Sequence, residues 1–135
     1  MISIIVPAFN EEEGLNAFYH ETHSELSKLS QVYEFVFVDD GSSDNSSQIA
    51  KKYLEHVLIH SVNLGKGAAL KTGCDFAVKK GAEFIVALDA DAQHNPDDIP
   101  RFIEKLKKYD IILSYRKSSS KMPLVLRFGN WFISN

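Results

Sequence analysis

Two carboxylates that directly follow an apolar run carry the strongest chemical signal in this sequence. Asp89 and Asp91 come after Phe84–Leu88, which has the pattern of a buried strand, and Gln93 adds a neutral oxygen two residues later. In extended backbone alternate residues face the same side, so both carboxylates can reach one ion or its waters. Mg²⁺ takes oxygen ligands and usually shares them between one or two carboxylates and the phosphates of a substrate. The pattern predicts a site for Mg²⁺ or Mn²⁺ that also holds the diphosphate of a nucleotide-linked substrate.

Helix capping is the simpler explanation of these acids. Asp91 or Asn95 would then start the next helix, but Asn95-Pro96 already supplies a cap and a proline at the first helical position. The metal role of Asp91 is therefore favoured. We interpret the neighbouring His94 as a residue at the helix start rather than a ligand.

A second acidic motif, Asp39-Asp40-Gly41-Ser42, follows the expected strand Glu34–Val38. A carboxylate at this place can accept a hydrogen bond from a nucleobase N–H. Uracil and guanine both offer such donors, so the motif does not identify the base. The alternative is an ordinary turn, in which an aspartate bonds to nearby backbone and the glycine relieves strain.

Further polar or aromatic residues follow the other apolar runs. Pro7 stiffens the chain after the first run, and Phe9 offers an apolar surface to a base or ribose, unless it packs in the core. Lys66 lies between two glycines and can approach phosphate, although the spacing is not that of a P-loop. Arg116 can pair bidentately with phosphate, or is a plain surface residue.

Short apolar runs alternate with amphipathic helical segments along the chain. Asn10 is expected to cap the first helix, with Glu13 completing a capping box. Such alternation predicts βαβ units, hence a three-layer α/β/α fold with a mainly parallel central sheet. Ligands bind beyond the carboxyl ends of the strands in such sheets, so the polar residues should meet at one edge. The expected strands are Ile2–Val6, Glu34–Val38, His56–His60, Phe84–Leu88 and Asp110–Ser114.

The bulk properties narrow the class of protein. With 135 residues the chain fits one domain, and a net charge of −3 gives no general attraction to nucleic acid. A single cysteine cannot form an internal disulfide, which suits a reducing compartment such as the cytoplasm. No signal peptide is visible, and no stretch approaches the roughly 20 apolar residues that span a bilayer.

Five motifs in order, VPAFNEEEGL, VDDGSSD, NLGKGAALKTG, DADAQHNPDDIP and SYRK, resemble the family 2 glycosyltransferases, especially the polyprenyl- or dolichyl-phosphate sugar synthases. The resemblance implies a GT-A fold and a metal-assisted, inverting transfer of a hexose from a donor of the UDP-glucose or GDP-mannose type to a polyprenyl or dolichyl phosphate. It implies that the nucleoside pocket is lined by Pro7, Phe9, Glu11, Val38 and Asp40. The metal and diphosphate would be held by Asp89, Ala90, Asp91 and Gln93. Arg116 would contact phosphate or sugar, and Lys66 is assigned to the nucleotide with less support because it matches a variable position.

The same resemblance implies that the chain has two parts. Residues 1–117 are expected to form the nucleotide-sugar-binding domain, and residues 118–135 to begin an acceptor-side segment that family members continue, so the chain is interpreted as shortened at its C-terminus. Met122–Ile133 suits a helix at a membrane interface, which would place the full-length form on the cytoplasmic face of a membrane. The alternative is a helix that packs on further residues of the protein.

Two other functions stay open at this stage. Without its acceptor half the chain could bind a nucleotide-sugar and not turn it over, and a family 2 enzyme could act on a glycan acceptor. A phosphotransfer receiver domain and an Asp-x-Asp phosphatase fit less well, because both need their acidic pair near the first strand. Here that strand leads into Asn10-Glu11.

Overall fold

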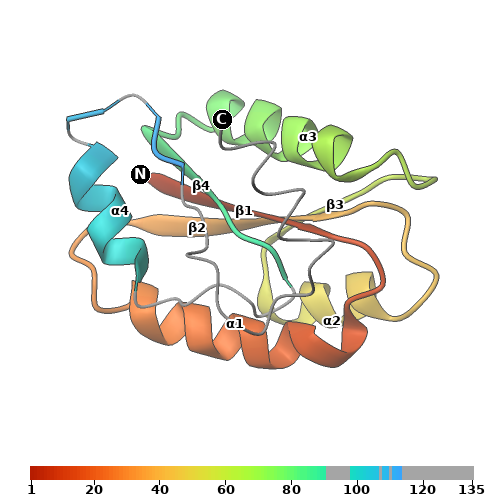
Figure 1. Ribbon diagram of the computed structural model, residues 1–135. Coiled ribbons are helices and arrows are strands. Elements are labelled where there is room, and N and C mark those ends of the chain that lie inside the picture. Colours follow the sequence, from red (N-terminus) through yellow and green to blue (C-terminus); the bar gives the residue numbers. More distant parts are fainter. Residues whose placement is uncertain (91–97, 107, 110, 114–135) are drawn as a thin grey trace, which may run out of the picture.

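The chain folds around a parallel β-sheet with helices on both faces (Figure 1). The computed structural model describes residues 1–90, 98–106, 108–109 and 111–113. The strands lie in the order β3-β2-β1-β4, and every pairing between them is parallel. This confirms the α/β fold class predicted from the alternating pattern. The elements are β1 (Ile2–Ala8), α1 (Glu12–Leu26), β2 (Tyr33–Asp39), α2 (Ser46–Tyr53), β3 (His56–Ile59), α3 (Lys66–Lys79), β4 (Phe84–Ala87) and α4 (Ile99–Leu106).

The central strand β1 joins the two halves of the core. All seven of its residues are buried, as expected for a parallel strand covered on both faces. Ile4 and Val6 pack in the cluster formed with α1, α2 and α4, whereas Ile5 packs with Ala69 and Ala77 of α3. Because side chains pack on both faces of β1, the end of the strand and the start of the following loop have a fixed position.

Helix α3 packs closely against the sheet at Gly73. Gly73 faces it, and a Cβ atom built on this glycine would lie 2.4 Å from Cγ2 of Ile5 and 3.1 Å from Cγ2 of Val38. Only a residue without a side chain allows this approach. Glycine is unfavourable in the interior of a helix. Here it is required because it sets the distance between α3 and the strands.

The start of α1 is stabilised differently from the sequence prediction. The N-cap residue, Glu11, makes no side-chain capping bond, so the box expected between Asn10 and Glu13 does not form. Instead, Ser46 Oγ accepts the backbone N–H of Glu11 at 2.8 Å, and Asp44 Oδ2 accepts the next N–H at 3.1 Å. The caps come from the end of the β2–α2 loop and the first residue of α2, because this segment lies beside the start of α1 in the folded chain.

The predicted fifth strand is not found in the part of it that the structure describes. Residues 111–113 adopt no strand conformation, and the side chains of Ile111 and Leu113 are 77% and 86% exposed. A strand needs a neighbour for its backbone groups, and these residues have no sheet partner among the described ranges. The expected helix start at Asn95-Pro96 lies outside the described residues, but α4 has the predicted buried face, with Ile99 and Ile103 in the core.

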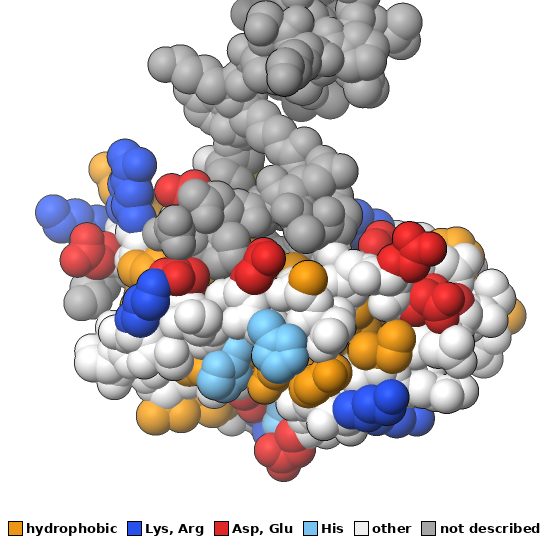
Figure 2. All heavy atoms as spheres, turned by 90° about the horizontal axis from the view of Figure 1, so that it is seen from below, with side chains coloured by type: hydrophobic (Ala, Val, Ile, Leu, Met, Phe, Trp, Pro, Cys, Tyr) orange, Lys and Arg blue, Asp and Glu red, His pale blue; other side chains and the backbone are white. Residues whose placement is uncertain are grey.

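Aromatic contacts join α1 to α2 on the face turned away from α3. Tyr19 and Tyr53 stack with ring centroids 4.9 Å apart, and His20 meets Tyr53 edge-on at 5.4 Å. Figure 2 shows histidine side chains near the middle of this face. None of the helices in the described part of the chain is long and apolar enough to cross a membrane.

Candidate functional site

A cavity of about 320 Å³ opens where the carboxyl ends of β1, β2 and β4 meet the loop between β3 and α3. This is the edge at which ligands bind in open parallel sheets. Strand-end residues that are far apart in the sequence come together here, as the alternating pattern predicted. The lining residues are Pro7, Ala8, Phe9, Glu11, Asp40, Asn63, Gly65, Lys66, Ala69, Asp89 and Ala90.

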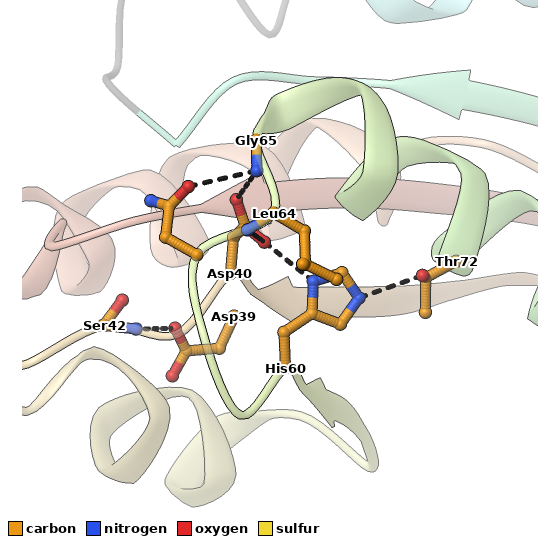
Figure 3. A network of polar contacts seen from close by, with 8 residues as sticks. Asp39, Asp40, Ser42, His60, Leu64, Gly65 and Thr72 are labelled. Atoms are coloured by element: carbon orange, nitrogen blue, oxygen red, sulfur yellow. Dashed lines mark hydrogen bonds and ion pairs between the residues drawn. The ribbon is translucent and has the colours of Figure 1, made fainter.

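Asp40 lines the cavity, and its carboxylate is held by several polar contacts (Figure 3). Its side chain is 4% exposed. Oδ1 accepts the backbone N–H of Leu64 at 3.0 Å, and Oδ2 accepts that of Gly65 at 2.7 Å. Nδ1 of His60 lies 2.7 Å from Oδ1, and Nε2 of the same ring lies 2.9 Å from the hydroxyl of Thr72 on α3.

The surroundings of Asp40 favour its charged form. Burial alone would raise the pKa of this carboxyl, but the hydrogen bonds from Leu64, His60 and Gly65 together outweigh burial and lower it below its ordinary value of 3.8. Asp40 is therefore a carboxylate near neutral pH. A buried carboxylate at a pocket wall is suited to accept a hydrogen bond from a ligand.

The two adjacent aspartates have different roles. Asp39 is also buried, but its Oδ1 accepts the backbone N–H of Ser42 at 2.8 Å and so closes the turn after β2. This is the turn chemistry considered as the simpler explanation of the motif, and it applies to Asp39. Asp40 lines the cavity instead.

Two glycines allow the loops around Asp40 to approach each other. Gly41 has a φ of 75°, and a Cβ there would lie 2.6 Å from the backbone carbon of Val62 and 2.7 Å from the backbone nitrogen of Asn63. Gly65 has a φ of 91°, a conformation that residues with side chains rarely adopt, and its N–H points at Asp40. The close approach of the β2–α2 and β3–α3 loops is thus a property of these glycines.

Asp89 and Lys66 form an ion pair elsewhere on the cavity wall. Nζ of Lys66 lies 2.5 Å from Oδ1 of Asp89, and the two side chains are 60% and 32% exposed. Asp89 is a partly exposed carboxylate that already attracts a cation, so its oxygen chemistry fits a hard divalent ion. The described residues contain no group of three or more potential His, Cys, Asp or Glu ligands.

The loop after β1 is fastened to the loop after β2 by side chains on both sides. Asn10 has a positive φ of 57°, and its Oδ1 accepts the backbone N–H of Ser43 at 2.9 Å. Oε2 of Glu12 accepts the backbone N–H of Asn45 at 2.8 Å. Asp44 and Ser46 cap the start of α1, and Asn10 and Glu12 in turn bind the backbone just before α2. The starts of the two helices therefore stabilise each other.

Most of the predicted site residues that the structure describes lie at the cavity. Phe9 is 45% exposed there, consistent with a surface for a ligand rather than a core role. Val38 is fully buried against α3 and is not among the lining residues. Asp91, Gln93 and Arg116 lie outside the described residues. Those that line the cavity are Pro7, Phe9, Glu11, Asp40, Lys66, Asp89 and Ala90.

Sequence reasoning missed His60 as a member of the site. Its ring contacts Asp40 directly. Its place at the end of the expected strand His56–His60 was an available signal, since polar residues at strand ends were the candidates for the site. Asn63, Gly65 and Ala69 were likewise not assigned, and they line the cavity.

Comparison with known proteins agrees with this geometry. Residues 3–130 match the family described as glycosyl transferase family 2. The chain belongs to glycosyl transferase family 2. That match covers nearly the whole sequence and confirms the resemblance seen in the five motifs.

Curated relatives of this family 2 chain include proteins of archaea and bacteria. An uncharacterised protein of Methanocaldococcus jannaschii is 40% identical over 96% of the chain and 54% of its own length. An undecaprenyl-phosphate 4-deoxy-4-formamido-L-arabinose transferase of Proteus mirabilis is 33% identical over 90% of the chain and 41% of its own length. The chain therefore spans about half, or less, of the length of these relatives.

Solved structures show the same fold. The Staphylococcus aureus protein TarS, in a fragment crystallised with UDP, is 26% identical and superposes with a TM-score of 0.61 over 81% of this chain and 32% of its own. Two further structures at 24% identity were solved with Mn²⁺ together with GDP-mannose or UDP, and at that identity they show the fold alone. The expected GT-A fold is confirmed.

Proposed function

We propose that the chain holds the donor-binding part of an inverting glycosyltransferase that moves a hexose from a nucleotide-diphospho-sugar to a polyprenyl or dolichyl phosphate. The observation that carries the proposal is one cavity with an ionised carboxylate, Asp40, on its wall and the Asp89–Lys66 pair also lining it. A nucleobase needs a hydrogen-bond acceptor, which Asp40 would be. A diphosphate needs positive charge, which Lys66 and a metal ion at Asp89 would supply. The name of the Proteus relative, a transferase to undecaprenyl phosphate, supports the lipid phosphate acceptor.

The nucleoside would occupy the part of the cavity near Asp40. The carboxylate accepts an N–H of the base, and the exposed ring of Phe9 covers a face of the base or ribose. Pro7 and Glu11 line the same cavity, and Val38 supports it from the core. Binding here fixes the donor before any chemistry takes place.

The diphosphate would lie next to Asp89. Asp89, with Asp91 and Gln93, would hold Mg²⁺ or Mn²⁺, beside the backbone of Ala90. The metal supplies charge neutralisation for the departing nucleotide diphosphate. The ammonium group of Lys66 is the nearest described cation to Asp89 and can turn toward a phosphate oxygen when the metal takes its place on the carboxylate. Arg116 would add a bidentate contact to phosphate or sugar.

The acceptor phosphate would attack the anomeric carbon from the side opposite the leaving diphosphate, which inverts the configuration. A phosphate monoester is already anionic near neutral pH, so a strong general base is not required. Residues 1–117 would provide the donor site, and residues 118–135 would begin the acceptor side and contact the membrane surface peripherally on the cytoplasmic face.

Calorimetric titration with a panel of nucleotide-sugars, with and without Mn²⁺, tests the donor site. We expect binding that requires Mn²⁺ and that is weakened at least about tenfold by Asp89→Ala, since a lost charged ligand costs more than about 1.4 kcal/mol. Asp75→Asn is the matched control, because Asp75 is an exposed acid on α3 that pairs only with Lys71 among the contacts described for it. Absence of binding to every donor would contradict the proposal.

Transfer is tested by incubating the chain, and a form extended to the length of its relatives, with labelled donor and polyprenyl phosphate. Labelled lipid product supports the transferase. Full activity of an Asp91→Ala variant would contradict the metal role. Donor binding without transfer by either form would favour a binding module, and transfer to a glycan instead of the lipid would replace the proposed acceptor.

A further inference from the structure

We propose that the packing around Asp40 leaves this carboxylate a single open acceptor position, and that the position selects a donor whose base offers one ring N–H, as uracil does, over guanine. The inference rests on the proposed function, because it takes the cavity to be a nucleotide site. It goes further in naming the base and in giving His60 a role in specificity. Asp40 and its neighbours carry it (Figure 3).

The protonation states around Asp40 follow from its charge. An ionised carboxylate can only accept hydrogen bonds, so each of its three neighbours must donate. Nδ1 of His60 therefore carries a proton and donates it to Oδ1. In the neutral ring Nε2 is then an acceptor, and the hydroxyl of Thr72 donates to it. Thr72 thus holds the imidazole in the tautomer and orientation that serve Asp40.

The acceptor positions of Asp40 can be counted. The two oxygens of a carboxylate offer about four lone-pair positions in total, two on each oxygen. Oδ1 accepts from His60 and from the N–H of Leu64, so both of its positions are used. Oδ2 accepts from the N–H of Gly65. Among the contacts of the described residues, one position on Oδ2 is left, and Asp40 lines the cavity.

Uracil and guanine make different demands on such a carboxylate. Guanine presents a ring N–H and an adjacent amino N–H as a fork, and pairing both requires a free position on each oxygen. Oδ1 has none, so guanine would leave one donor unpaired against a carboxylate that is 4% exposed. Uracil presents a single N–H between two carbonyl groups and needs one position. Cytosine and adenine would turn a ring nitrogen lone pair toward the negative charge.

The neighbours of Asp40 are too well held to make room for guanine. His60 is 11% exposed and is fixed at both ring nitrogens. The N–H groups of Leu64 and Gly65 belong to a backbone turn that Gly41 brings close to β2. Breaking the bond from His60 would leave a largely buried ring N–H without its acceptor, so the base must adapt to the carboxylate.

Titration of the chain with UDP and GDP, each with Mn²⁺, tests the inference because the two ligands share the diphosphate and the metal. We expect UDP to bind at least about tenfold more tightly, the ratio for one buried unpaired donor. UDP that is methylated at the ring nitrogen of uracil should bind the unaltered protein at least about tenfold more weakly than UDP does. This probe keeps the test independent of how any variant folds.

His60→Leu then tests the specificity role. Removing the imidazole frees a position on Oδ1, so the ratio of UDP to GDP affinity should fall several-fold. His56→Leu is the matched control, since His56 is the first residue of β3, the strand that His60 directly follows, is 13% exposed and pairs with Glu34. In His56→Leu the ratio of UDP to GDP affinity should equal that of the unaltered protein.

The outcomes separate the two proposals. Equal or tighter binding of GDP, full binding of the methylated UDP, or an unchanged ratio in a folded His60→Leu variant would overturn this inference and leave the proposed function standing. Failure of every nucleotide to bind would overturn the proposed function and this inference together.

Discussion

Asp44 shows how one carboxylate positions two helices at the rim of the cavity. Its Oδ2 accepts the N–H of Glu12 at the start of α1, and its Oδ1 accepts the N–H of Ser46 at the start of α2. Burial alone would raise the pKa of Asp44, but these bonds lower it below the ordinary value of 3.8. A side chain that is not among the lining residues thus holds the segments next to the cavity.

Asp44→Asn should lower the free energy of unfolding near neutral pH by about 1–3 kcal/mol, because the amide keeps one acceptor oxygen and leaves one of the two N–H groups without a partner. Because the folded-state pKa is depressed, the carboxylate contributes fully above pH 3.8, and the contribution shrinks as the pH falls through the folded value. Urea unfolding between pH 3 and pH 7 should therefore show the two proteins converging in acid. A constant difference down to the lowest pH would contradict this account.

We expect Lys66 to compete with a metal ion for Asp89, because its ammonium group pairs with this carboxylate. Lys66→Met should tighten binding of Mn²⁺ alone by up to about fivefold, since an exposed ion pair contributes roughly 1 kcal/mol or less. The same variant should bind UDP with Mn²⁺ more weakly, because a cation near the diphosphate is lost. Calorimetry with the metal alone and then with both ligands separates the two effects. Weaker binding of Mn²⁺ alone would show that Lys66 does not compete for Asp89.

At the scale of elements, the approach of α3 to the sheet positions the loop that encloses Asp40. Gly73 sets that approach, because a methyl group there would collide with Ile5. The same helix carries Thr72, which orients His60. Packing in the core and the geometry of the site are therefore linked through a single helix.

Gly73→Ala should destabilise the protein by about 1–3 kcal/mol through overpacking. Gly67→Ala is the matched control in the same helix, since a Cβ there meets no atom within 4 Å, and alanine should be neutral or stabilise by up to about 1 kcal/mol. Thermal or urea unfolding of both variants checks this. Equal effects would mean that helix propensity, rather than the contact with β1, decides the outcome.

At the scale of the whole molecule, the cavity unites the ends of three strands and one connecting loop. A ligand bound there would contact segments from both halves of the sheet, so its binding would be coupled to global unfolding. The described residues include Asp40, the proposed base contact, and Asp89, the proposed carboxylate near the diphosphate.

Saturation with UDP and Mn²⁺ should raise the unfolding temperature by several degrees. At a concentration about 100 times the dissociation constant, binding to the folded state alone adds about 2.7 kcal/mol. Pyrophosphate with Mn²⁺ serves as the control and should stabilise less, because it cannot reach Asp40. Equal shifts with the two ligands would argue against a base site at Asp40.

The sequence by itself determined the alternation of the first four strands with helices, the parallel sheet and the edge at which polar residues meet. These follow from local patterns, since apolar runs mark buried strands and the residues after them must lie at the carboxyl edge. Asp40, Lys66 and Asp89 were placed at the cavity in this way. The tertiary structure alone decided which partner each polar group finds. The caps of α1 come from residues 32 to 35 positions away, and His60 reaches Asp40 across 20 residues. Such pairings depend on how closely two loops pass, which glycines and core packing set together and no local pattern records.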